Sequence, residues 1–140
     1  MKKVVALALS FIVVIIGIVY ISNKATYTSM RKEVMDEISL TNIVKVTFRR
    51  YSDDKETIIK DKRRIEQMLA GLSDMKLIKV RDISADREYA VRIYLKDKNI
   101  GFEVTEDMEY MVIFKGSGHQ LYKVLDGKDH LKTIEALDYR

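Results

Sequence analysis

The most constraining feature of this chain is an uninterrupted apolar run near its N-terminus. The 18 residues from Val4 to Ile21 carry no charge, and the most polar of them is Ser10. As a helix the run would be about 27 Å long, close to the thickness of the hydrocarbon core of a bilayer. A backbone in lipid must satisfy its own hydrogen bonds, so we expect a transmembrane signal anchor over residues 1–22.

Two other interpretations of the run stay open. A cleaved signal peptide has a shorter apolar region, of about 7–15 residues, and small residues before the cut. Here Asn23 occupies a position that should be small, so an uncleaved anchor is favoured over cleavage near Ala25. The third interpretation is a buried segment of a soluble protein. Because the chain has no cysteine, a lipid attached through a lipobox-type cysteine is excluded.

The orientation in the membrane is predicted from the form of the N-terminus. Lys2 and Lys3 precede the run and Lys24 follows it, so the positive-inside count is nearly balanced. Two lysines directly before an apolar run resemble an export signal. We therefore expect a single-pass protein of the cell membrane with residues 22–140 outside the cytoplasm.

The basic character of the chain is concentrated in this N-terminal region. The net charge is +4, and Lys2 and Lys3 supply half of it, because residues 1–21 contain no acid. Elsewhere basic and acidic residues are interleaved, without the dense basic face that nucleic acid requires. A composition of 47% hydrophobic and 33% charged residues is typical of a folded domain. The absence of cysteine excludes disulfides, thiolate zinc sites and cysteine nucleophiles.

The residues that follow the run change from a helical to a strand period. Met30, Val34 and Ile38 share one helical face, which predicts an amphipathic stalk or docking helix within residues 23–41. Residues 42–140 then alternate apolar and polar side chains, as half-buried strands do. Strands are predicted at residues 43–50, 56–60, 77–83, 88–96, 100–105, 110–115 and 119–125.

Two helices are predicted among these strands. Asp61 is a plausible N-cap for KRRIEQMLAGL, and a last helix is expected from about residue 128. Consecutive strands joined by short turns imply antiparallel pairing, because parallel crossovers need intervening helices. The sequence therefore predicts an α+β domain, a mostly antiparallel sheet of about six or seven short strands with two helices on one face.

No pattern in the chain predicts catalysis, a metal or a cofactor. The two histidines, His119 and His130, have no partner at metal-ligand spacing. Ser-x-x-Lys occurs three times, but the companion motifs of penicillin-binding enzymes are missing. Acidic residues cluster within residues 53–56 and again within residues 103–109, and neither cluster fits the ligand order of a calcium loop. We therefore expect no catalytic residue, no metal ligand and no cofactor.

A binding surface is predicted from two tyrosines and an arginine. Tyr94 alternates away from the apolar residues of its strand and shares a side with Arg92, and Tyr122 alternates away from Leu121. If the helices cover one face of the sheet, all three side chains would lie on the open face, where aromatic residues and arginine suit an interface. The alternative is that the tyrosines are half-buried under the helices.

The segment VKVTFRRYSDDKETIIKDKRRIEQMLAGLS, placed after an anchor, resembles small extracytoplasmic proteins of low-GC Gram-positive bacteria. In those proteins a strand, an acidic turn, a short strand and a helix open a compact α+β domain. The resemblance covers these 30 residues and the anchor. It implies a membrane-anchored or lipoprotein-like domain of unknown function and assigns no residue a role.

These features together lead us to expect a non-catalytic, membrane-anchored module. It would contact an envelope protein, a peptide or a wall polymer. The alternatives are a small envelope hydrolase and an inhibitor or immunity-type protein.

Overall fold

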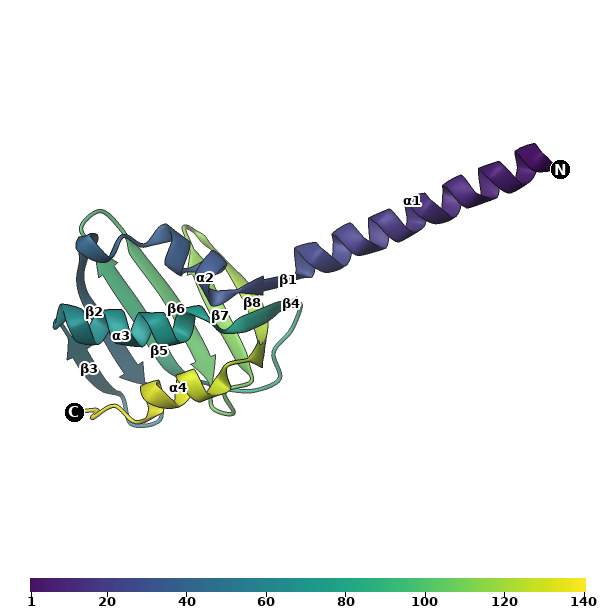
Figure 1. Cartoon of the computed structure of the whole chain (residues 1–140). Helices are drawn as coiled ribbons and strands as arrows, with labels where there is room; N and C mark the ends of the chain where they lie inside the picture. The colour runs from purple at the N-terminus through teal and green to yellow at the C-terminus, as the bar shows by residue number, and fades with distance from the viewer.

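In the computed structural model the chain forms one long N-terminal helix and a mixed helix-and-sheet body (Figure 1). The structure describes residues 1–140, except for the side chains of residues 23–25. Helix α1, Lys2–Thr26, projects away from the body. Its stretch Lys2–Ser22 is long and apolar enough to cross a membrane and is not buried by the rest of the chain. An anchor and a signal sequence both have these properties.

The body is built on one antiparallel sheet in the order β1-β4-β8-β7-β6-β5-β2-β3. The strands are β1 (Tyr27–Ser29), β2 (Ile43–Arg50), β3 (Lys55–Ile59), β4 (Lys76–Val80), β5 (Arg87–Leu95), β6 (Asn99–Thr105), β7 (Tyr110–Lys115) and β8 (Gly118–Asp126). The helices after α1 are α2 (Met30–Glu33), the 3-10 turns η1 (Met35–Glu37) and η2 (Leu40–Asn42), α3 (Lys62–Ser73) and α4 (Lys128–Glu135). The predicted α+β class is confirmed, with eight strands instead of six or seven.

Helices α3 and α4 lie on the same face of the sheet (Figure 1). The side chain of Asp61 caps α3 by accepting a hydrogen bond from the backbone N–H of Arg64 at 2.8 Å. The apolar stripes of both helices face the sheet, and this packing forms the core. The core residues exposed by no more than 1% include Leu72, Leu77, Ile93, Phe102, Met111, Ile113, Leu131 and Ile134.

The single helix predicted within residues 23–41 is wrong. Residues Tyr27–Ser29 pair with β4 instead, and the backbone N–H of Met30 donates to the carbonyl of Met75 at 2.9 Å. Sheet pairing therefore overrides the helical period of this segment. Met30 and Val34 are nevertheless fully buried, so the segment docks on the body as short turns. The body consequently begins at Tyr27, earlier than the predicted residue 42.

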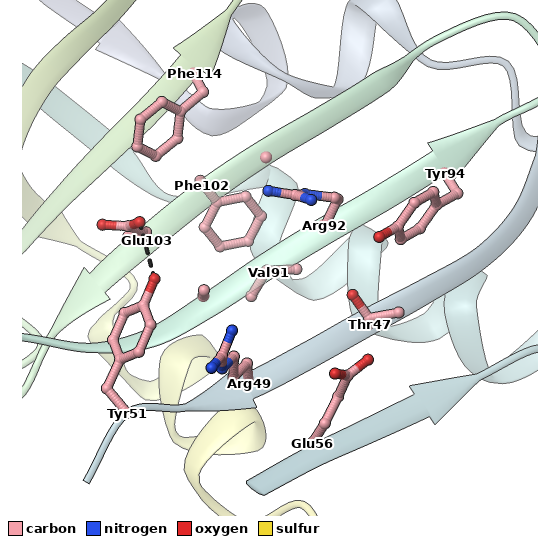
Figure 2. A pocket seen from close by; sticks show the side chains of 12 residues that line it. Thr47, Arg49, Tyr51, Glu56, Val91, Arg92, Tyr94, Phe102, Glu103 and Phe114 are labelled. Carbon is pink, nitrogen blue, oxygen red and sulfur yellow. Dashed lines mark hydrogen bonds between the residues drawn. The ribbon is translucent and has the colours of Figure 1, made fainter. Parts of the chain in front are cut away.

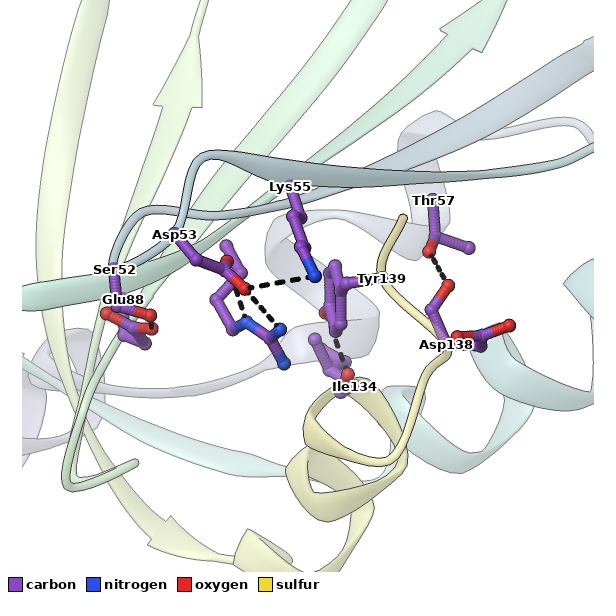
Figure 3. A network of polar contacts seen from close by, with 9 residues as sticks. Ser52, Asp53, Lys55, Thr57, Glu88, Ile134, Asp138 and Tyr139 are labelled. Carbon is purple, nitrogen blue, oxygen red and sulfur yellow. Dashed lines mark hydrogen bonds and ion pairs between the residues drawn. The ribbon is translucent and has the colours of Figure 1, made fainter.

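The C-terminal tail covers the outer edge of β3. Glu56 and Arg140 exchange backbone hydrogen bonds of 3.3 and 3.4 Å, and the hydroxyl of Thr57 donates to the carbonyl of Asp138 (Figure 3). Tyr139 is only 6% exposed and donates its hydroxyl to the carbonyl of Ile134 at 2.8 Å. An uncovered strand edge is a site of aggregation, so the tail protects this one.

Candidate binding site on the open sheet face

The sheet face opposite α3 and α4 carries a shallow hollow over β2, β5 and β6 (Figure 2). The antiparallel register aligns Thr47, Arg92, Gly101 and Phe114 in one row across β2, β5, β6 and β7. Cross-strand neighbours in one row share a face, so these four side-chain positions all face the hollow.

Small residues form the floor of the hollow. Ala90 belongs to the next row on the same face, where it lies opposite Glu103. Neither Ala90 nor Gly101 has a side chain long enough to fill the space between the larger residues around them. The resulting volume is about 170 Å³. The residues that line it are Thr47, Arg49, Tyr51, Glu56, Ala90, Val91, Arg92, Tyr94, Gly101, Phe102, Glu103 and Phe114.

One rim of the hollow carries two separate sets of hydrogen-bonded polar side chains. Glu103 accepts hydrogen bonds from the hydroxyl of Tyr51 at 3.0 Å and from Nη1 of Arg87 at 2.9 Å. Arg49 is hydrogen-bonded through Nε to Asp54 at 2.8 Å. Burial, followed by the hydrogen bond to Glu103, raises the pKa of Tyr51 above its ordinary value. These groups satisfy one another and hold the rim in place.

The other side of the hollow carries the two predicted residues Arg92 and Tyr94. Arg92 is exposed, and among the side chains that the structure describes none accepts a hydrogen bond or forms an ion pair with it. Tyr94 is partly buried, with Nζ of Lys45 at 4.7 Å from the centroid of its ring. The structure therefore brings Arg92 and Tyr94 together on the open face, as the alternation predicts.

Tyr122 does not share this face, and its predicted place there is wrong. It is 1% exposed and lies opposite Met111, on the helix-covered side of the sheet. The strand HQLYKVL has apolar residues at both parities, so its alternation is ambiguous. In the structure Tyr122 and Val124 face the core, and Leu125 is 48% exposed. The alternative that places a tyrosine under the helices is thus correct for Tyr122.

The residues that give the hollow its shape were not predicted from the sequence. Ala90 has the same parity as Arg92 and Tyr94, so it was available from the strand pattern. Gly101 lies opposite Arg92, and Phe114 lies opposite Gly101. The register of three strands sets this alignment, and no local sequence pattern contains it.

Neither histidine takes part in the hollow. His119 lies at the edge of the open face, with its ring centroid 6.1 Å from that of Phe114. His130 lies on α4, where its ring is close to Gly71 of α3. Among the described residues no group of three His, Asp or Glu side chains is placed to hold a metal ion. The hollow offers a guanidinium, hydroxyls, carboxylates and aromatic surface, a set suited to binding.

Comparison with known proteins adds no identification. No family model matches the chain, and no curated protein or solved structure matches it either. The resemblance to small extracytoplasmic proteins therefore stays a prediction.

Proposed function

We propose that this protein is a non-catalytic binding module that α1 anchors in the cell membrane, with the body outside the cytoplasm. The open face of the sheet contacts an envelope protein, a peptide or a wall polymer. The observation that supports this is the hollow on the uncovered face, where Arg92 has no acceptor among the described side chains. Arginine and aromatic residues are enriched where proteins bind partners.

Site-specific photo-crosslinking in membranes tests the binding face. A benzoylphenylalanine replaces Tyr94 in the full-length chain, and the matched control carries it at Thr133, an exposed position on α4. The expected result is a discrete adduct from position 94 that is absent from position 133. Equal labelling from both positions, or no adduct from position 94, contradicts the proposal.

Protease accessibility tests the orientation. With the body outside the cytoplasm, protease added to cells stripped of their wall degrades residues 27–140 while a cytoplasmic marker stays intact. Protection of the body until the membrane is dissolved by detergent would reverse the orientation.

A further inference from the structure

Some of the basic side chains on the open face have acidic partners and others do not. Arg49 is engaged by Asp54, and Arg87 is engaged by Glu103. Arg92 lies over the floor of the hollow without an acceptor among the described side chains, and Lys45 stands beside it over Tyr94. Among the described side chains Glu56 of the hollow has no ion pair either, so Arg92 and Lys45 together exceed it by one positive charge, and Arg92 is the guanidinium of the pair.

A guanidinium selects the shape of its ligand as well as its charge. Its planar fork pairs with a carboxylate through two parallel hydrogen bonds, which the ammonium of a lysine cannot form. Gly101, directly opposite Arg92, has no side chain of its own beside the fork. Phe114 and Tyr94 flank that space with ring surface (Figure 2). A carboxylate on a short aliphatic stem matches these features.

The carboxylates of the hollow argue against a polyanionic ligand. Glu56 and Glu103 both line it, and each would repel a phosphate monoester, with nearly two negative charges at neutral pH, more strongly than a carboxylate with one. A peptide presents one carboxylate to Arg92. Its amide N–H groups can also donate hydrogen bonds to the carboxylate oxygens of the hollow. Donors and acceptors around the hollow thus match a peptide carboxylate better than a phosphate monoester.

The size of the hollow limits how much of the ligand it encloses. Sites that enclose a drug-sized ligand have volumes of about 300–1,000 Å³. The hollow measures about 170 Å³, which suits a single side chain of a larger partner.

We propose that the hollow binds an acidic side chain of a peptide segment in a partner protein, with Arg92 as the residue that pairs with its carboxylate. This inference rests on the proposed function and adds the chemical class of the ligand. Gly101 and Ala90 leave room for the aliphatic stem, and Tyr94 and Phe114 flank it.

Titration of the full-length chain with short peptides tests this assignment. The probes are acetyl-Ala-Glu-Ala-amide, the same peptide with Gln or phosphoserine in place of Glu, and inorganic phosphate. ¹⁵N-labelled chain in detergent micelles reports binding through the amide shifts of Gly101, Ala90 and Arg92. We expect the glutamate peptide to shift these amides with a Kd on the order of 1 mM, and the glutamine peptide to leave them unchanged.

Variants at Arg92 distinguish the bidentate hydrogen-bonding geometry of the guanidinium from its positive charge. Arg92→Gln is expected to weaken binding of the glutamate peptide about tenfold or more, because it removes a charge-assisted hydrogen-bond pair. Arg92→Lys keeps the charge and is expected to weaken it as well, since the bidentate geometry is lost. The matched control, Arg63→Gln on the exposed side of α3, leaves the titration unchanged.

Each remaining outcome bears on one of the two proposals. Phosphoserine peptide or phosphate binding as tightly as the glutamate peptide overturns the carboxylate assignment. Unshifted hollow amides, alongside capture of a partner from position 94, overturn the ligand class and leave the binding module standing. Shifts that depend on Arg92, without any captured partner, support the ligand class and count against the proposed function.

Discussion

The carboxylate of Glu33 in α2 accepts hydrogen bonds from Nζ of Lys115 in β7 and from Oγ1 of Thr28 in β1, both at 2.7 Å. Tyr122 of β8 is 1% exposed and lies close enough to Glu33 for each group to shift the pKa of the other. The cluster joins β1, α2 and β7 through one carboxylate, with β8 beside it. Burial, followed by the nearby Glu33 carboxylate, raises the pKa of Tyr122, so its hydroxyl stays protonated. The start of the body is thereby fastened to the sheet.

Substitutions at the two predicted tyrosines should have different effects on stability. Tyr122→Ala empties a fully buried site and is expected to lower the free energy of unfolding by about 3–5 kcal/mol. Tyr122→Phe removes only the hydroxyl and should cost about 1 kcal/mol. Tyr94→Ala, on the open face, should cost about 0.5 kcal/mol. Urea unfolding of the full chain followed by circular dichroism measures all three, and equal losses at positions 94 and 122 would contradict their assignment to opposite faces.

Glu33 should make stability depend on acid pH. Burial alone would raise the pKa of its carboxyl, but hydrogen bonds from Lys115 and Thr28, together with the nearby Tyr122 hydroxyl, outweigh burial and hold it below the ordinary value of 4.5. A pKa lower in the folded than in the unfolded state stabilises the fold above the unfolded pKa. That stability is lost as the pH falls through the folded pKa.

The Glu33→Gln variant tests this linkage. We expect it to be less stable than the parent chain at pH 7, with the difference shrinking as the pH falls below 4.5. Urea midpoints between pH 7 and pH 3 measure the difference. Asp53→Asn is the comparison for an exposed carboxyl: its pKa is also lowered, mainly by the hydrogen bond with Arg50, but solvent screens that contact, so its pH-dependent change should be smaller. A difference in stability between Glu33→Gln and the parent chain that stays constant with pH would contradict this linkage.

Two glycines with positive φ form a matched pair. Gly127 has φ of 88°, and a Cβ added there would lie 2.9 Å from Cγ of Met75. Gly116, in the β7–β8 turn, has φ of 55° and nothing within 4 Å of an added Cβ. Gly116→Ala should therefore cost only the backbone strain of about 1–2 kcal/mol. Gly127→Ala should add overpacking of about 1–3 kcal/mol, and equal thermal shifts for the two variants would contradict the crowding at Met75.

The tail that covers β3 should depend on Tyr139. Its ring packs 6.1 Å from the ring of Tyr89, and the guanidinium of Arg50 lies 4.6 Å from its centroid. Tyr139→Ala is expected to release the tail, speed hydrogen exchange at the Glu56 amide and promote self-association through the β3 edge. Arg140→Ala is the control, because its contact with Glu56 is made by backbone atoms. Unchanged exchange at Glu56 in Tyr139→Ala would show that the tail is held by other contacts.

The membrane assignment predicts the mass and partition of the protein. An uncleaved anchor gives a chain that includes residues 1–25 and stays in the membrane pellet after alkaline carbonate extraction. Ile15→Asp places a charge near the middle of the span, at a cost of about 3 kcal/mol, and should reduce the pelleted fraction, whereas Ile15→Leu should not. A mature chain that starts directly after Ala25 would establish a cleaved signal peptide.

Local pattern was sufficient for the elements whose partners are near in sequence. The N-cap Asp61 predicted α3, and hairpin alternation predicted the central strands. It failed at Tyr27–Ser29, whose pairing partner in β4 lies about fifty residues further along the chain. In β4 the core residue is Leu77, while Ile78 and Val80, of the opposite parity, are only partly buried.

The candidate site was predictable only in part, for the same reason. Strand parity placed Arg92 and Tyr94 on one face, because that relation lies within a single strand. The hollow between them depends on Gly101 and Phe114, which only the registers of β5, β6 and β7 bring opposite Arg92. Parity failed for Tyr122 because both sides of its strand are apolar.

Helix α1 ends at Thr26 and β1 begins at Tyr27, so the apolar helix leads directly into the first strand of the sheet. A compact body of about 100 residues has a radius of gyration of about 13 Å. With α1 in a bilayer, the reach of the hollow is therefore a few tens of ångströms from the lipid surface. Under the proposed function, partners deeper in the envelope would be out of range, whereas a partner in the same membrane would meet the hollow by lateral diffusion. At such short range a high effective concentration makes even a weak contact sufficient.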